Sequence, residues 1–362
     1  MQIDMHYYGT YAMARAAGLS PEATKIIATA AQFVDDNADK ESIEFEDGGR
    51  LDAEATAHHA FNFKNIDRED QRKIWVPFHF LPGNQGSSYT ERLTCRMNSP
   101  VLDDVLKFTI SKVEEKQPYA LQLVGITAHV YADTYAHYGF SGISSRRNKI
   151  DGESFEFPGI TPKMKEHIDM RAEEFRENFP KEEGLLANVK SWFAETFSGA
   201  LGHGAAVTFP DRPYLVWKFV YEYPQESSPL RNNPETFLQG AHALHEFFSK
   251  VAKANPEFAA EKPMNFSAIE PNVKAIIEKQ GKKRDRILAW QSAARQGALF
   301  ASGGPISPYS ADNWLNQRSQ LKRRKNSTDA RNTAIFRFYQ AASVYRLHLL
   351  RHVLPDHGLV VS

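Results

Sequence analysis

The chain has 362 residues, of which 42% are hydrophobic and 24% are charged, as is usual for a folded globular protein. Its 44 basic and 44 acidic residues balance, so the overall charge gives no reason to expect nucleic acid or an anionic membrane as a partner. The single cysteine, Cys95, excludes an internal disulfide and a multi-cysteine zinc site. Neither a secretory signal nor an apolar run that could span a bilayer is recognisable. We expect a cytoplasmic protein, with signal-independent export left open.

The first long helix is predicted over residues 21–36. Ser20 is a typical N-cap, and proline follows it at the first helical position. Apolar residues then recur at helical spacing up to the acidic pair Asp35 and Asp36. The acidic, glycine-containing residues 38–54 are typical of a surface loop.

Further helices alternate with loops rich in glycine and proline. The remaining helices are predicted at residues 100–115, 118–140, 164–198, 234–255, 271–298 and 333–353. The loops between them are predicted at residues 74–90, 141–163, 199–215 and 302–332. No alternating strand pattern and no internal repeat is found, so the predicted fold is all-α and multi-helix with long loops.

The segment HVYADTYAHYGF, residues 129–140, carries the chemistry best suited to a site. His129, Asp133 and His137 follow one another at intervals of four, so they share one face of a helix, about 6 Å apart along its axis. Imidazole and carboxylate are typical zinc ligands. Three such ligands over two turns could serve two adjacent ions, with Asp133 bridging. The alternative is a packed helix whose polar groups are satisfied by hydrogen bonds.

Other candidate ligands lie beside helix ends or in stiff loops in separate segments. The metal-ligand candidates in addition to His129, Asp133 and His137 are His6, Asp36 (or Asp35), His58 (or His59, or His79), His79, His203 and Asp211. The catalytic candidates are Asp133, Asp36 and Asp4. Asp4 or Asp35 could orient a histidine or accept a proton. The pair His242 and His245 with Glu246 is more typical of a packing or solvated helix face.

The order of these candidates resembles that of bacterial zinc-dependent phospholipases C and fungal-type zinc nucleases. Those families are all-α enzymes that hold three zinc ions and cleave phosphodiesters. Their N-terminal residue itself binds metal, whereas here five residues precede His6, so either Asp4 takes that place or one metal ion is absent. Residues 1 to about 220 also resemble an uncharacterised bacterial family, through the phrases HYY, FVDDN, PFHFLPG and GHGAA. HD-domain phosphohydrolases are a more distant likeness, because their adjacent His-Asp pair does not occur in this sequence.

The resemblance implies a metal-dependent hydrolase, and most directly a phosphoesterase that uses two or three divalent ions. Zinc is the expected metal, with manganese, iron and magnesium as alternatives. The substrate would be a small molecule or other phosphoester, and nucleic acid would enter as substrate only. We expect a phospholipase C/nuclease-like helical core in residues 1–220 that binds metal and is catalytic, and a helical extension in residues 221–362 packed on it as one unit. A non-catalytic helical scaffold with a structural metal or a polar His/Asp network is the competing hypothesis.

Overall fold

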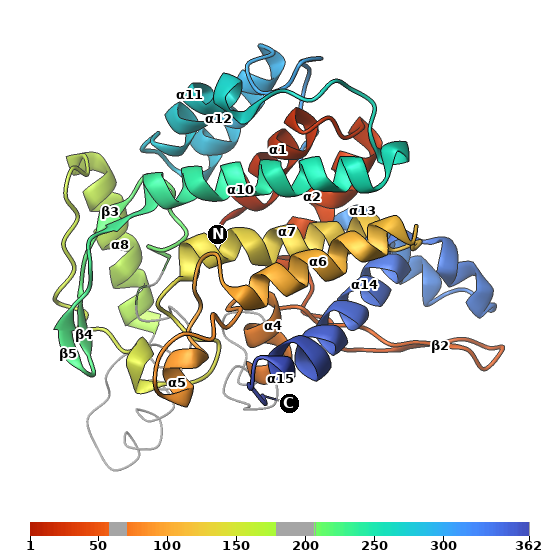
Figure 1. Ribbon diagram of the computed structural model, residues 1–362, viewed down its shortest axis with the longest axis horizontal. Helices are drawn as coiled ribbons and strands as arrows, with labels where there is room; N and C mark the ends of the chain where they lie inside the picture. Colours follow the sequence, from red (N-terminus) through yellow and green to blue (C-terminus); the bar gives the residue numbers. More distant parts are fainter. Residues whose placement is uncertain (58–70, 179–205, 207, 362) are drawn as a thin grey trace.

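The computed structural model describes residues 1–57, 71–178, 206 and 208–361. Its architecture is mostly helical, as predicted (Figure 1). The α-helices are α1 Thr10–Ala16, α2 Pro21–Asp36, α4 Val76–Phe78, α5 Tyr89–Arg92, α6 Pro100–Glu114, α7 Ala120–His137, α8 Pro162–Asn178, α10 Asn233–Ala254, α11 Phe266–Ile277, α12 Lys283–Arg295, α13 Asp312–Leu321, α14 Ala334–His348 and α15 Leu354–Asp356. Short π-helices cover Asp4–Gly9, Gln71–Trp75 and Leu349–Val353.

The described part of the chain also holds six short strands, which form three antiparallel pairs. The strands are β1 Ile43–Glu44, β2 Arg50–Leu51, β3 Val216–Trp217, β4 Val220–Glu222, β5 Gln225–Ser227 and β6 Arg231–Asn232. β1 pairs with β2, β3 with β6, and β4 with β5. Strands of two or three residues are too short to show an alternating pattern, so they could not be predicted from the sequence.

Helix α7 lies at the centre of the molecule and is surrounded by α2, α6, α10 and α14 (Figure 1). Nearly all of its side chains are buried, including the apolar residues on every face. A helix that is apolar all round is stable only inside a protein, which explains its central position. The helix ends at His137, earlier than predicted, because Tyr138 is extended and Gly139 adopts a φ of +89°.

Helices α2 and α7 pack closely enough to require a glycine at their crossing. A Cβ atom on Gly125 would lie 2.4 Å from the backbone oxygen of Ile27 and 2.5 Å from the Cβ of Ala30. Helix α2 itself begins as predicted, because the Ser20 side chain accepts a hydrogen bond from the Ala23 N–H. This close crossing brings the end of α2 next to the middle of α7.

The C-terminal third packs on the same central helices. Helix α10 contacts α1, α6 and α7, and α14 contacts α7. The single helix predicted at residues 271–298 is in fact two helices, α11 and α12, and the predicted polar loop at 302–332 contains α13. In the described part of the chain, no helix is both long and apolar enough to cross a membrane.

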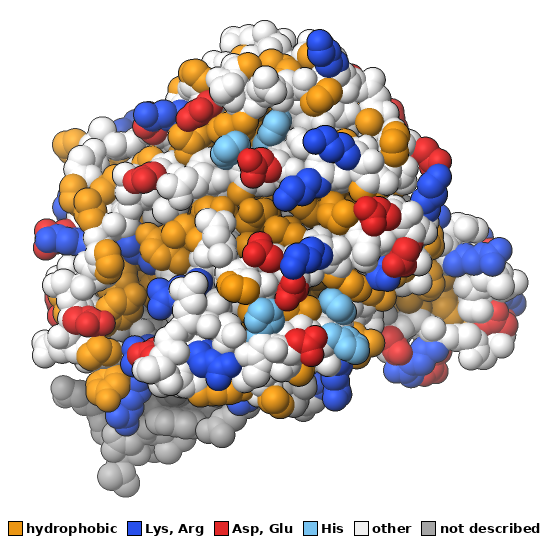
Figure 2. Space-filling view, in the orientation of Figure 1, with side chains coloured by type: hydrophobic (Ala, Val, Ile, Leu, Met, Phe, Trp, Pro, Cys, Tyr) orange, Lys and Arg blue, Asp and Glu red, His pale blue; other side chains and the backbone are white. Residues whose placement is uncertain are grey.

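Hydrophobic side chains gather between α6 and α10 on the face shown in Figure 2. They belong to a groove of about 580 Å³ that includes Leu106, Ile110, Tyr131 and Phe247. None of the predicted ligands lines this groove, so it is separate from the site described next.

Candidate metal centre

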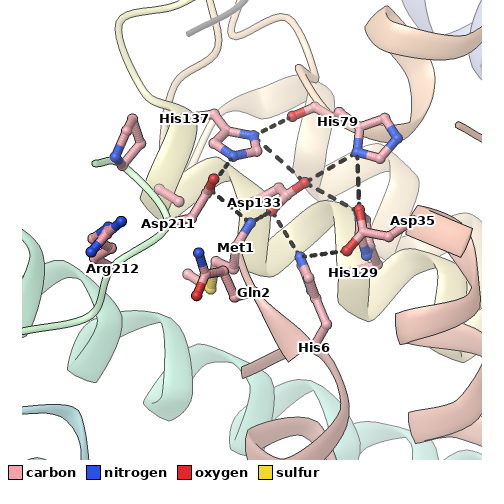
Figure 3. A network of polar contacts seen from close by, with 12 residues as sticks. Met1, Gln2, His6, Asp35, His79, His129, Asp133, His137, Asp211 and Arg212 are labelled. Carbon is pink, nitrogen blue, oxygen red and sulfur yellow. Dashed lines mark hydrogen bonds and ion pairs between the residues drawn. The ribbon is translucent and has the colours of Figure 1, made fainter. Parts of the chain in front are cut away.

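Histidines and aspartates from five segments meet beside α7 (Figure 3). The central helix contributes His129, Asp133 and His137, the three residues predicted to share one face. The other contributors are His6 from the first π-helix, Asp35 from the last turn of α2, His79 from the end of α4, Asp211 from the loop before β3, and the α-amino group of Met1.

Three histidines each donate one ring N–H to a backbone carbonyl. The Nδ1 of His129 donates to the Ala31 oxygen at 2.7 Å, and the Nε2 of His79 donates to the Thr56 oxygen at 2.8 Å. The Nδ1 of His137 donates to the His79 oxygen at 2.9 Å. A carbonyl can only accept, so these nitrogens carry protons, and the second nitrogen of each ring faces an aspartate of the cluster. Metal-binding histidines are typically oriented in this way.

The second ring nitrogens of His79 and His129 face each other. His79 Nδ1 and His129 Nε2 are 3.3 Å apart, and Asp133 Oδ2 lies 3.6 Å from the first and 3.2 Å from the second. Asp35 Oδ1 lies 3.8 Å and 3.9 Å from the same two nitrogens. Burial lowers the pKa of His129, but Asp133 and Asp35 outweigh it and raise the pKa above its usual value. These carboxylates therefore favour positive charge at this point, whether a proton or a metal ion.

His6 is completely buried, and neither of its nitrogens has a hydrogen-bond partner among the described residues. Its Nε2 lies 3.2 Å from Asp133 Oδ1 and 3.9 Å from Asp35 Oδ2, and its ring stacks on His129 with centroids 3.8 Å apart. Burial, together with the nearby charges of His129 and the α-amino group, lowers the pKa of His6 to about 4, although Asp133 opposes the shift. His6 is therefore a buried imidazole whose Nε2 points at the carboxylates of Asp133 and Asp35.

Asp133 stands between two sets of partners. Its Oδ1 lies 2.5 Å from the amino nitrogen of Met1 and faces His6, whereas its Oδ2 faces His79 and His129. Burial alone would raise the pKa of this carboxyl, but the positive charges around it hold the pKa well below its usual range. Asp133 is thus a carboxylate whose two oxygens point to different partners, the geometry needed to bridge two ions.

A second part of the site joins His137 to Asp211. His137 Nε2 lies 3.0 Å from Asp211 Oδ1, and the amino nitrogen of Met1 lies 3.2 Å from the same oxygen. Burial disfavours the charged amine, but Asp133, Asp211 and Asp35 outweigh it and raise the pKa of the amine to about 11. The amine is therefore an ammonium group shared by two carboxylates.

A cavity of about 160 Å³ opens onto this cluster. Its lining residues are Met1, Asp35, Ala57, Trp75, His79, Phe80, Asp133, His137 and Asp211. Two of them are aromatic, and Phe80 stacks on the ring of His137 with centroids 4.8 Å apart. A small concave space with apolar walls and converging polar groups is typical of a ligand site.

Two sets of donor atoms are close enough to share an ion. In the described ranges, the sets His6, His129, Asp133 and Asp35, His79, His129 each offer donor atoms within 4.8 Å of one another. Zinc binds nitrogen and oxygen ligands at about 2.0 to 2.2 Å, so donors at this spacing can reach a common ion.

Asp35, and not Asp36, is the aspartate of α2 that enters the cluster. The prediction chose Asp36 and left Asp35 as the alternative. Asp36 is exposed, and its Oδ2 accepts a hydrogen bond from the Tyr309 hydroxyl at 2.5 Å. Consecutive helical residues point about 100° apart, so only one of the two can face His129.

Asp4, a predicted catalytic residue, is buried and forms an ion pair with Arg286. The Arg286 Nε donates to Asp4 Oδ2 at 2.6 Å and its Nη2 donates to Asp4 Oδ1 at 3.1 Å. This pairing anchors the segment that precedes His6 and gives Asp4 a role in binding the arginine. The contact could not be predicted, because Arg286 is 282 residues away in the sequence.

Three predicted ligands lie outside the described residues, and one group that was not predicted contributes to the cluster. His58, His59 and His203 lie outside the described residues, so His79 is the member of its group of alternatives that the structure locates in the cluster. The α-amino group of Met1 was not predicted, since no sequence pattern indicates where a main-chain amine will lie.

No curated protein and no solved structure matches the chain. A match to the family described as "Family of unknown function (DUF6765)" covers residues 1–353. That match includes every residue of the candidate metal centre and nearly the whole chain, so the protein belongs to this family.

Proposed function

We propose that the protein is a metal-dependent hydrolase that cleaves phosphoesters with two or more divalent ions. The observation that carries the proposal is the 3.3 Å approach of two imidazole nitrogens, those of His79 and His129. Two carboxylates, Asp35 and Asp133, face the same point, and buried His6 lacks hydrogen-bond partners among the described residues. A shared cation would satisfy all of these groups at once.

The donor set favours zinc over magnesium or calcium. Three imidazole nitrogens and two carboxylates are borderline ligands, whereas the hard ions prefer oxygen alone. His6, Asp35, His79, His129 and Asp133 would hold the ions, with manganese and iron as the alternative metals. Asp133 would bridge, because its two oxygens already face different partners.

Such ions supply a water of lowered pKa and positive charge for the phosphoryl oxygens. The chain's own residues position the histidine rings and supply a group for proton transfer. The carbonyls of Ala31, Thr56 and His79 fix the histidine rings. The pair His137 and Asp211, which lines the cavity, offers an imidazole and a carboxylate within 3.0 Å for proton transfer.

The cavity supports a small reacting group as substrate. Its volume of about 160 Å³ accommodates a phosphoryl group and its nearest atoms, and Trp75 and Phe80 provide apolar walls. We propose a phosphodiester, whether free, in a lipid head group or in a nucleic acid. The likeness of the helical core to the zinc phospholipases and nucleases is part of this proposal.

A metal-free polar network is the competing function, and one observation favours it. The ammonium group of Met1 lies 2.5 Å from Asp133 and 3.2 Å from Asp211, so it already supplies positive charge to both carboxylates. In that case the cluster would stabilise a helical scaffold and carry out no reaction.

Metal analysis of untagged protein after incubation with zinc and dialysis separates these functions. We expect at least one bound ion per chain in the wild type and about tenfold weaker binding or more in His129→Ala and Asp133→Asn. His242→Ala is the matched control, because His242 is exposed, pairs with Glu246 and belongs to neither of the two donor sets. Equally negligible metal in the wild type and all variants would rule out the hydrolase.

The second step measures hydrolysis of a chromogenic phosphodiester. We expect activity in the zinc-loaded wild type that a chelator abolishes and that added zinc restores. Zinc binding without any chelator-sensitive hydrolysis of phosphoesters would instead indicate a structural metal.

A further inference from the structure

The His137–Asp211 pair joins two segments that are 74 residues apart in the sequence. His137 is the last residue of α7, and Asp211 belongs to the loop before β3. Neither a helix end nor a loop holds a side chain as firmly as the middle of a helix does. Some other part of the chain must therefore fix the 3.0 Å contact between them.

Arg231 in β6 holds the backbone on both sides of His137. Its Nη2 donates to the Ala136 oxygen at 2.7 Å and its Nη1 donates to the Tyr138 oxygen at 2.8 Å. The last carbonyls of a helix have no partners within the helix, so a guanidinium that binds them caps the helix. His137 lies between the two residues that this cap holds.

The charge of Arg231 has no carboxylate partner among the described residues, although its side chain is only 3% exposed. The guanidinium carbon lies instead 3.7 Å from the ring centroid of Tyr138, 5.3 Å from that of Phe140 and 5.1 Å from that of Trp217. A buried cation without an anion is costly, and cation–π contacts offset only part of that cost. The two carbonyl contacts are therefore the main polar interactions that this buried guanidinium makes.

Asn233, two residues further on, holds the backbone on both sides of Asp211. Its Nδ2 donates to the Phe209 and Arg212 oxygens, each at 2.8 Å. Its Oδ1 accepts a hydrogen bond from the Trp217 indole at 3.1 Å, which fixes the orientation of the amide. Asn233 therefore holds the backbone of the Asp211 loop by hydrogen bonds to its carbonyls, as Arg231 holds the backbone at the end of α7.

We propose that Arg231 and Asn233 form a backbone clamp that sets the distance and orientation of the His137–Asp211 pair. Both are positioning residues, because these four hydrogen bonds go to the main chain on either side of the pair. The pairing of Trp217 with Arg231 in the β3–β6 ladder keeps the clamp itself in register. The role of the clamp in the metal centre rests on the proposed function, whereas its effect on His137 does not.

The first experiment uses metal-free, full-length protein with ¹⁵N-labelled histidine. Long-range proton–nitrogen spectra report the tautomer and hydrogen bonding of each ring, and His137→Asn assigns the His137 signals. We expect these signals to shift in Arg231→Met and Asn233→Ser and to move back toward the wild-type position in Arg231→Lys, which keeps a donor. The His129 signals should stay in place.

Arg15→Met is the matched control. Arg15 is also a buried arginine that donates to a backbone carbonyl, that of Leu19 at 2.5 Å, but it pairs with Glu261 away from the site. Unchanged His137 signals in Arg231→Met, or equal shifts in Arg15→Met, would overturn the clamp.

The second experiment measures zinc binding by the same variants. We expect Arg231→Met and Asn233→Ser to weaken zinc binding by about 10- to 100-fold, as is usual for residues that orient ligands, because His137 donates to the carbonyl of His79. Arg15→Met should leave zinc binding unchanged. If the wild type binds no zinc, the proposed function fails, but the spectra still decide whether the clamp exists. Wild-type affinity in both clamp variants would contradict its role in the metal centre.

Discussion

At the scale of single residues, the two adjacent aspartates of α2 offer a sharp test. Asp35→Asn removes a carboxylate that faces His79 and His129, so we expect zinc affinity to fall by at least about tenfold. Asp36→Asn is the matched variant, because asparagine can still accept the hydrogen bond from Tyr309. It should bind zinc as the wild type does. Titration with a competing zinc-sensitive dye measures the zinc affinity of both variants. A larger loss of affinity in Asp36→Asn than in Asp35→Asn would mean that Asp36 is the ligand.

The same pair shows how far sequence reasoning reaches at this scale. The spacing of His129, Asp133 and His137 predicts a common face, and the structure places all three in one cluster. Spacing along one helix cannot say which residue of another helix points toward that face, because a rotation of about 100° exchanges Asp35 with Asp36. That rotation is set by the packing of α2 on α7.

At the scale of elements, Gly125 sets the α2–α7 distance. We expect Gly125→Ala to destabilise the fold by about 1 to 3 kcal/mol, because the new methyl group would lie 2.4 Å from the Ile27 oxygen. It should also weaken zinc binding, since α2 carries both Asp35 and the Ala31 carbonyl that orients His129. Thermal unfolding and zinc titration measure the two effects.

Gly152→Ala is the control for this substitution, because nothing lies within 4 Å of the added methyl group. It should leave both the unfolding temperature and zinc affinity unchanged. Unfolding of Gly125→Ala at the wild-type temperature would show that the two helices can move apart without cost, and the α2–α7 crossing would then not fix the site.

Long helices were predictable from sequence and short strands were not. The predicted helix at residues 21–36 coincides with α2, because a capping serine, a proline and a sustained apolar period all agree. β3 and β6 are only two residues long each, and their partners lie 14 or more positions away. Their pairing depends on tertiary contacts around Trp217 and Arg231, which no local pattern records.

At the scale of the whole molecule, the C-terminal third completes the site that the first two thirds supply. Arg286 in α12 anchors the N-terminal segment through Asp4 and Gln2, and Tyr309 binds Asp36. Sequence reasoning found no motif in this third, because residues that support a site through distant contacts follow no local spacing. The division into a core and an extension therefore says little about which residues the site needs.

The Arg286–Asp4 pair tests this dependence. Both side chains are buried, at 2% and 1% exposure, and their closest contact is 2.6 Å. Arg286→Met leaves the Asp4 carboxylate buried without its partner, which we expect to cost about 3 to 5 kcal/mol of unfolding free energy. Because Asp4 lies two residues before His6, the same variant should also bind zinc more weakly at a temperature where it is fully folded.

The double variant Asp4→Asn, Arg286→Met separates two effects of losing the ion pair. One is the cost of an unpaired buried charge, and the other is the loss of the contact that positions His6. The double variant removes the uncompensated charge, so urea unfolding should show it to be more stable than Arg286→Met alone. Its zinc affinity should stay low, because the amide and the thioether no longer tie the π-helix of His6 to α12. Recovery of wild-type zinc affinity along with stability would show that α12 contributes only to the fold, and that His6 is held in place by its stacking on His129.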